Sequence, residues 1–187
     1  MHDPAFLELI DACLRGHAPS EKALFTRFAQ GTMAIARRFA ADEPQALDYL
    51  QECWIVIFDK LRLFDPEKGS FQGWISKISV RVILQCLRKN KHKIQLLEFP
   101  AELPEAELEA SDLQHIPPEK VLDAVRQLPE GYRTVFNLYV FDNWSHRDIA
   151  QSLGIAESAS RSQLARAKQQ LKSQLQQVLR QYEQGLV

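Results

Sequence analysis

The stretch that decides the fold is SHRDIAQSLGIAESASRSQLARAK, residues 145–168. Ser145 is followed three residues later by Asp148, which is the capping-box pattern with Asp in place of the usual Glu, and it predicts the start of a short helix. Gly154 supplies the left-handed residue that ends this helix. A longer helix then follows, predicted over residues 157–182. A short helix, a glycine turn and a longer helix predict a helix-turn-helix.

Helical periodicity extends through the rest of the chain. Apolar residues recur at spacings of three and four over six further segments, namely about 4–15, 20–41, 44–61, 70–88, 118–128 and 132–141. Leu14 and Leu47 are among the residues expected to face inward. No window alternates apolar and polar residues between turn signals, so strands are not expected. The predicted fold class is all-α, with two small helical domains.

The charge distribution predicts where these domains meet. The formal net charge of the 187 residues is −1, but it divides into +3 over residues 1–97, −6 over residues 98–120 and +2 over residues 121–187. The acidic part also holds four prolines, and like charges and proline both favour an extended chain. We therefore expect domains at 1–97 and 118–187, joined by an acidic flexible linker at 98–117.

Several classes of protein are disfavoured by the sequence. The longest apolar run, Trp54 to Phe58, is far shorter than the roughly 20 residues that cross a bilayer, and no signal peptide is recognisable, so no membrane insertion is expected. Three scattered cysteines fit a reduced, cytoplasmic protein. The five histidines lack metal-ligand spacing, and no phosphate loop or nucleophile elbow occurs. We expect no enzymatic activity, no catalytic residues, no metal and no cofactor.

The longer helix of the helix-turn-helix has the composition of a DNA-binding element. It carries several cations, has no acid between Ser158 and Tyr182, and begins with short polar side chains of the kind that contact base edges. A helical hairpin with a solvated basic face is the alternative. The candidate DNA-binding residues of this element are Ser145, Arg147, Ser158, Ser160, Arg161, Ser162, Gln163, Arg166 and Lys168.

A second basic tract, from Lys68 to Leu97, holds seven cations and no acid. It begins with two aromatic residues beside a glycine-containing loop, an arrangement that suits single-stranded or locally opened nucleic acid. The alternative is that the two rings, Phe71 and Trp74, belong to the core. The candidate residues here are Lys68, Phe71, Trp74, Lys77, Arg81, Arg88 and Lys89.

A third candidate surface is acidic. Asp48, Gln51 and Glu52 fall on one face of a predicted helix because they are three and four residues apart. They fit a docking surface for a basic protein partner, although a solvated acidic face explains them equally well.

Together these motifs resemble the extracytoplasmic-function (ECF, group IV) sigma factors of bacterial RNA polymerase. The first half carries three stretches of that pattern, and the second half carries Leu128-Pro129 followed by residues 145–168. The three stretches are Asp48-x-x-Gln51-Glu52, Phe71-x-x-Trp74-Ile75 and Arg88-Lys89. The resemblance covers most of the chain, and it implies a region 2 domain followed by a region 4 domain.

The resemblance also implies a role for each surface. Asp48, Gln51 and Glu52 would bind the core polymerase, the stretch 64–88 would melt and read the −10 element with a flipped base in its loop, and the helix 158–168 would enter the major groove of the −35 element. The acidic linker would lie in the positively charged channel of the polymerase. Promoter DNA and the RNA polymerase core enzyme are the implied partners, and an anti-sigma factor is left open.

Two departures from the family pattern affect the recognition helix. Ala159-Ser160 stand where a Thr-Val pair is usual, and Gln163 stands where an Arg is usual. These departures leave the −35 sequence preference undetermined. A free-standing helix-turn-helix regulator that binds duplex operators as a dimer is the alternative function, and an adaptor that binds only protein is a weaker third.

Overall fold

The computed structural model describes residues 3–89 and 116–183, with side chains as far as Arg180. The chain divides at Lys89 into two compact units, each of which is described below by itself. The all-α fold class is confirmed, because the residues in these two ranges form helices and no strand. Within them, no helix is both long enough and apolar enough to cross a membrane.

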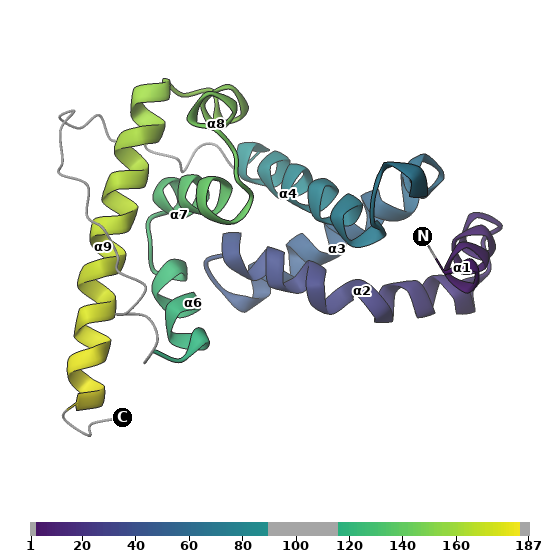
Figure 1. The fold of residues 1–187 in the computed structure, drawn as a ribbon, viewed down its shortest axis with the longest axis horizontal. Helices are drawn as coiled ribbons and strands as arrows, with labels where there is room; N and C mark the ends of the chain where they lie inside the picture. The colour runs from purple at the N-terminus through teal and green to yellow at the C-terminus, as the bar shows by residue number, and fades with distance from the viewer. Residues whose placement is uncertain (1–2, 90–115, 184–187) are drawn as a thin grey trace. The chain divides into compact units, whose positions relative to one another are not determined.

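The first unit contains four α-helices and two short 3-10 turns (Figure 1). Two of the helices begin at an aspartate whose side chain accepts a backbone hydrogen bond: Asp3 accepts from the N–H of Ala5 at 3.1 Å, and Asp42 accepts from the N–H of Gln45 at 2.8 Å. The elements are α1 (Pro4–Leu14), α2 (Ala18–Phe39), α3 (Glu43–Asp59), η1 (Leu61–Leu63), η2 (Pro66–Lys68) and α4 (Phe71–Lys89).

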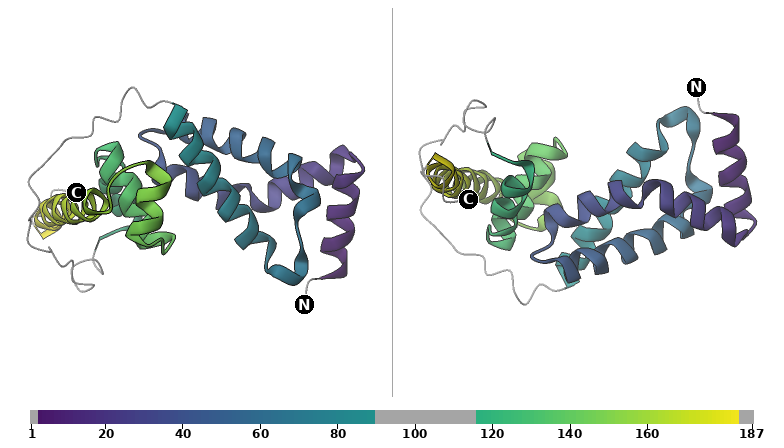
Figure 2. Two further views of the ribbon diagram at one scale, coloured as in Figure 1. Left: turned by 90° about the horizontal axis from the view of Figure 1, so that it is seen from above. Right: turned by 90° about the horizontal axis from the view of Figure 1, so that it is seen from below.

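Helices α2, α3 and α4 pack against one another in pairs, and α1 crosses one end of this bundle (Figure 2). The shared core contains Phe39, Ile57 and Ile75, all of them fully buried. Two sequence expectations are wrong here: Leu14 and Leu47 are 48% and 53% exposed. The buried positions beside them are Cys13 and Ala46, so in each helix the inward stripe lies one residue earlier than the larger side chain suggested.

The second unit is built along its longest helix. That helix, α9 (Glu157–Glu183), packs against α6 (Pro118–Arg126), α7 (Glu130–Phe136) and α8 (His146–Leu153). The predicted helix 132–141 begins two residues earlier, and its second half is a π-helical turn, η4 (Asn137–Phe141). Asn137 is fully buried there, and its amide donates to the carbonyl of Arg133 at 2.9 Å.

Most of the predicted acidic linker, and the predicted boundary at residue 97, lie outside the described residues. The last two residues of the predicted linker are described and belong to the second unit. Ile116 is 5% exposed, and Pro117 caps the start of α6. Ile116 and Pro117 are therefore part of the described second unit.

Candidate nucleic-acid interface and docking face

The helix-turn-helix has the local geometry that its sequence predicts. The hydroxyl of Ser145 accepts from the backbone N–H of Asp148 at 3.1 Å and donates to its carboxylate at 2.6 Å. Gly154 ends α8 at φ 68° and ψ 38°, in the left-handed region. Ile149 and Ala150 are buried where α8 packs on α9. These contacts fix the N-terminal turn of α9 relative to α8.

Helix α9 has a buried face and an exposed face. Leu164, Ala167 and Leu171 face the unit's core, whereas Ser158 and Arg161 are exposed. The remaining predicted contacts on this helix, Ser162, Arg166 and Lys168, are half-buried, and Arg147 is exposed on α8. The guanidinium of Arg161 forms an ion pair with Glu157 one turn earlier. The exposed face of the first turns of α9 therefore carries short polar side chains flanked by cations.

Two of the predicted base-contacting residues lie elsewhere. Ser160 has no exposed surface, and its hydroxyl lies 2.9 Å from Nδ1 of His146, so the prediction that it reads base edges is wrong. Gln163 lies against α7, where a Cβ at Gly131 would be only 3.1 Å from its Oε1. Both residues fill the space under the recognition helix because they fall on the side of α9 that meets the other helices.

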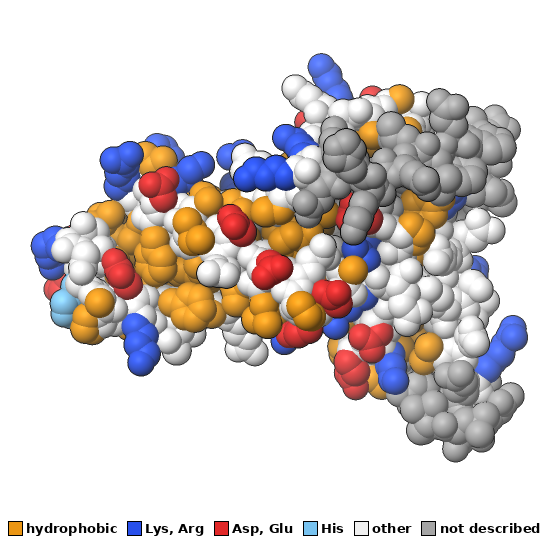
Figure 3. Space-filling view, turned by 180° about the vertical axis from the view of Figure 1, so that it is seen from behind, with side chains coloured by type: hydrophobic (Ala, Val, Ile, Leu, Met, Phe, Trp, Pro, Cys, Tyr) orange, Lys and Arg blue, Asp and Glu red, His pale blue; other side chains and the backbone are white. Residues whose placement is uncertain are grey.

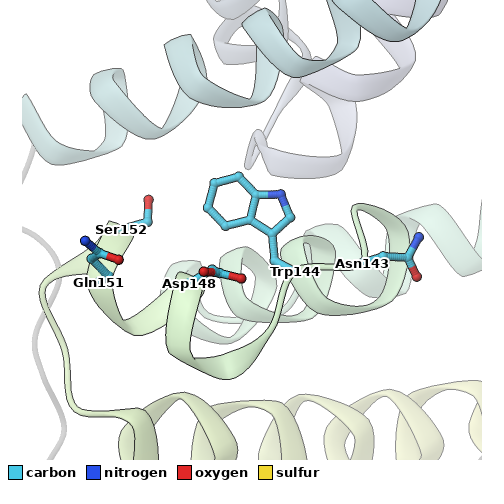
Figure 4. Close-up of a pocket in the computed structure, with 5 residues that line it drawn as sticks. All are labelled: Asn143, Trp144, Asp148, Gln151 and Ser152. Atoms are coloured by element: carbon cyan, nitrogen blue, oxygen red, sulfur yellow. The ribbon is translucent and has the colours of Figure 1, made fainter. Parts of the chain in front are cut away.

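A hollow lies beside α8. It is lined by Asp148, Gln151 and Ser152 from that helix and by Asn143 and Trp144 from the turn before it (Figure 4). Asn143 adopts a positive φ of 55°, which an asparagine tolerates. The charged member of the lining is Asp148, an acid that would repel a phosphate. We therefore do not assign the DNA backbone to this hollow.

The basic tract of the first unit is presented by α4 and the turn before it. Lys77, Arg81, Arg88 and Lys89 are all exposed on α4. Lys68, in the preceding turn, binds the carboxylate of Asp65 at 2.9 Å. The hydrogen bond from Lys68, together with the backbone N–H of Glu67, lowers the pKa of Asp65. This contact holds the turn in place while the cations on α4 stay accessible.

Phe71 is at the centre of an aromatic cluster rather than on the surface. It is 2% exposed, and its ring centroid lies 5.3 Å from that of Phe6, 4.9 Å from Phe28 and 5.0 Å from Phe64. Other aromatic rings therefore cover most of its ring, as the core alternative predicts, and direct contact of Phe71 with DNA stays a prediction. Trp74 is half-buried and packs on both Phe64 and Phe71, at 5.6 and 5.5 Å.

A cavity of about 250 Å³, widely open to solvent, lies above this cluster. Its lining has an aromatic floor and a polar rim and consists of Asp3, Phe6, Arg27, Phe28, Ser70, Phe71 and Gln72. The guanidinium of Arg27 lies over the rings of Phe6 and Phe28, at 5.2 and 5.5 Å from their centroids. Sequence reasoning missed Arg27 because it is isolated from the basic tract.

The predicted acidic face on α3 is accessible. Asp48, Gln51 and Glu52 are all exposed. Leu47 and Ile55, which are 53% and 58% exposed, stand four residues to either side of Gln51 and so share this face. Figure 3 shows apolar side chains over a broad area of this unit, with acidic side chains among them. The face combines charge with apolar area, as protein interfaces commonly do.

The described residues contain no group of three or more histidine, cysteine or carboxylate side chains that could hold a metal ion. Cys13 and Cys53 are buried, Cys86 is half-buried, and all three are free thiols. Burial raises the pKa of Cys53 to about 12, which leaves it protonated and unreactive at neutral pH.

Comparison with known families identifies both units. Residues 24–93 match the profile for Sigma-70 region 2, and residues 119–171 match the profile for Sigma-70, region 4. The ECF RNA polymerase sigma factor SigE of Mycolicibacterium smegmatis is 26% identical over 84% of this chain and 62% of its own length. The ECF RNA polymerase sigma factor RpoE of Cereibacter sphaeroides is 24% identical over 81% of this chain and 84% of its own.

A solved structure is also similar. It is the sigma factor RpoE of Bartonella quintana in complex with the anti-sigma factor NepR, with a TM-score of 0.47, 19% identity and coverage of 83% of this chain and 96% of that one.

Proposed function

This chain is an ECF sigma factor of the sigma-70 family, and from that premise we propose how its two units divide the work of promoter recognition. It directs the core enzyme of bacterial RNA polymerase to specific promoters and helps to open promoter DNA. The observation that carries this function is the presence of region 2 and region 4 in one chain, in that order. A free-standing helix-turn-helix regulator is not favoured, because region 4 alone would suffice for it.

The second unit contacts the −35 element through α9. Ser158 and Ser162 lie on the outer side of its first turns, where side chains reach base edges in the major groove. Arg161, Arg166 and Lys168 flank them and bind phosphates. Ser145 acts as the cap of α8, and exposed Arg147 adds a phosphate contact at the start of that helix.

The first unit contacts the −10 element through α4 and the cavity at its start. The phosphates of the non-template strand follow the exposed cations Lys77, Arg81, Arg88 and Lys89, with Lys68 at the loop. An unstacked base enters the cavity and packs on its aromatic floor. Phe71 forms part of that floor, and Arg27 at the rim is available to a base edge or a phosphate.

The acidic face of α3 binds the core polymerase. Asp48 and Glu52 supply charge for a basic partner surface, and Gln51 supplies hydrogen bonds. Exposed Leu47 and Ile55 supply apolar contact area, which the charged side chains of this face do not provide. The acidic linker, 98–117, would lie in the positively charged channel of the polymerase, and an anti-sigma factor stays an open third partner. As an initiation factor the chain performs no chemistry of its own.

The test is run-off transcription reconstituted from core polymerase and this chain. We expect promoter-dependent transcripts with the wild-type chain, and their loss in Glu52→Lys because core binding weakens. Asp11→Lys, which reverses an exposed acid on α1, is the matched control and should transcribe normally. If Glu52→Lys binds core polymerase normally and still fails to transcribe, the docking assignment is wrong. A chain that shifts duplex DNA alone and yields no transcripts with core enzyme would instead be a classical regulator.

A further inference from the structure

The buried hydroxyl of Ser160 is the least expected feature of the recognition helix. It lies on the inner side of α9 with no exposed surface, between the exposed Ser158 and Arg161. A buried hydroxyl needs a hydrogen-bond partner, because leaving it unpaired costs the free energy of desolvating it. The chain must therefore hold a partner under the recognition helix.

His146 is that partner, and it joins three elements. It is the first residue of α8, and its Nδ1 lies 2.9 Å from the hydroxyl of Ser160 on α9. Its ring stacks on Tyr139 of η4, with centroids 4.6 Å apart and an interplanar angle of 22°. The imidazole thus has one face against η4 and one edge bonded to α9, so its position is defined from both sides.

We propose that His146, through its hydrogen bond to Ser160, is the residue that positions the first turns of α9 for base readout. The proposal rests on the proposed contact of α9 with the −35 element. Ser158 and Ser162 each stand two residues from Ser160. Their short side chains reach base edges only when α9 lies deep enough in the major groove. His146 is a positioning residue, which touches the helix and not the bases.

The charges around His146 predict that DNA binding is linked to its protonation. Its pKa is lowered, first by burial and then by Arg161, with Lys168 adding to the effect and Glu157 opposing it. Tyr139 on η4 stacks on its ring, and Arg147 and Asp148 follow it along α8. DNA phosphates beside Arg161 and Lys168 would offset those cations, so the pKa should rise in the complex. Binding should then take up a proton, and affinity should increase as the pH falls through the pKa that His146 has in the complex.

The test is a double-mutant cycle in the holoenzyme, assembled from core polymerase and the full chain. The probes are a duplex selected by the wild-type holoenzyme from a randomised pool and a scrambled version of it. His146→Phe keeps the stacking on Tyr139 but leaves the hydroxyl of Ser160 unpaired, and Ser160→Val removes the other partner. We expect each single variant to lose about five- to tenfold in preference for the selected duplex. The double variant, which replaces both partners by apolar groups, should recover to within about twofold of wild type.

The pH profile separates positioning from a purely structural role. Wild-type affinity should rise between pH 7.5 and pH 5.5, and the double variant should lose that slope while remaining folded in a thermal melt. Ser173→Val, at an exposed position on α9, should match wild type throughout.

Three outcomes are decisive. A wild-type holoenzyme that shows no preference for its selected duplex would overturn the proposed function itself. A selective wild type with single variants that are equally selective would overturn only the role of His146. The role of His146 would also be overturned if the double variant did not regain its preference for the selected duplex, or if its affinity still rose as the pH falls.

Discussion

The two helices that we propose contact DNA, α4 and α9, are anchored in different ways. Helix α4 starts on an aromatic cluster, where the buried ring of Phe71 contacts three other phenyl rings. Helix α9 rests on aliphatic and small side chains, with a partly buried polar pair, Ser160 and His146, at its first turns. Both helices therefore present an exposed polar face that is set by a buried contact directly beneath it.

The two kinds of buried contact contribute differently to their helices. An aromatic cluster buries much apolar area and adds about 0.5–1.5 kcal/mol for each well-oriented ring pair, so it gives α4 a rigid base beside the cavity. A hydrogen-bonded pair contributes less to stability but fixes direction. We infer that the first unit uses its buried contact mainly for stability, and the second unit mainly for orientation.

The largest expected effect is on the stability of the first unit. Phe71→Ala should lower its free energy of unfolding by about 3–5 kcal/mol, because a buried ring is lost and the cluster around it cannot fill the space. Chemical denaturation followed by tryptophan fluorescence at Trp54 and Trp74 measures this. Phe71→Leu, which keeps much of the volume, should cost clearly less. A small effect of Phe71→Ala would contradict the stabilising role of the cluster.

A smaller effect, on binding alone, is expected at the docking face. Ile55→Asp should weaken binding to core polymerase by about 2 kcal/mol, or roughly thirtyfold, because an apolar contact becomes a buried charge. Leu63→Asp is the matched control, since Leu63 is an equally exposed leucine outside this face, at 63%. Pull-down or anisotropy with core enzyme gives the affinities. Equal losses in both variants would show that the interface is not centred on α3.

On α9, a single cation should have a modest effect that does not depend on sequence. Arg161→Gln should weaken binding of the holoenzyme to selected and scrambled duplexes alike, and reduce the salt dependence of log K by about one unit. Arg180→Gln, near the far end of the same helix, should leave that slope unchanged. The contrast with the His146 and Ser160 variants is informative, because those should change selectivity and not the salt slope.

The smallest expected effect concerns how well the first unit shields its buried thiol from solvent. All three cysteines lie within residues 1–89, so thiol labelling reports on that unit alone. Cys53 should resist a maleimide reagent at pH 7–8, because burial blocks access and raises its pKa to about 12. Its thiolate becomes available only as pH rises toward that value, or when the unit opens. Mass spectrometry of Phe71→Ala should then find Cys53 labelled faster than in wild type.

Much of the fold was predictable because its signals are local. The capping box at Ser145 and the left-handed Gly154 each depend on a few neighbouring residues, and both appear in the structure as expected. The inward faces of α1 and α3 were less predictable. Leu14 and Leu47 are apolar and at helical spacing, but the crossing of the helices buries the smaller residues beside them.

Among the candidate site residues, too, some features were predictable from the local sequence and others depended on packing. Exposure of Asp48, Glu52 and Arg161 followed from charge and helical spacing. Phe71 and Ser160 were assigned to surfaces because of their residue types, and both are buried. Arg27 was missed because its ring contacts come from α1 and its own helix and not from a run of cations.

The sequence by itself determined the helices, the charge pattern and the order of the two sigma regions, because capping, periodicity and motif spacing act over a few residues. Only the tertiary structure decided which side of each helix is covered. That choice depends on contacts between residues far apart in the chain, as where His146 meets Ser160 and where Phe6 meets Phe71. Burial is a property of the packed unit, and it placed Phe71 and Ser160, both expected on a surface, among the buried residues of their units.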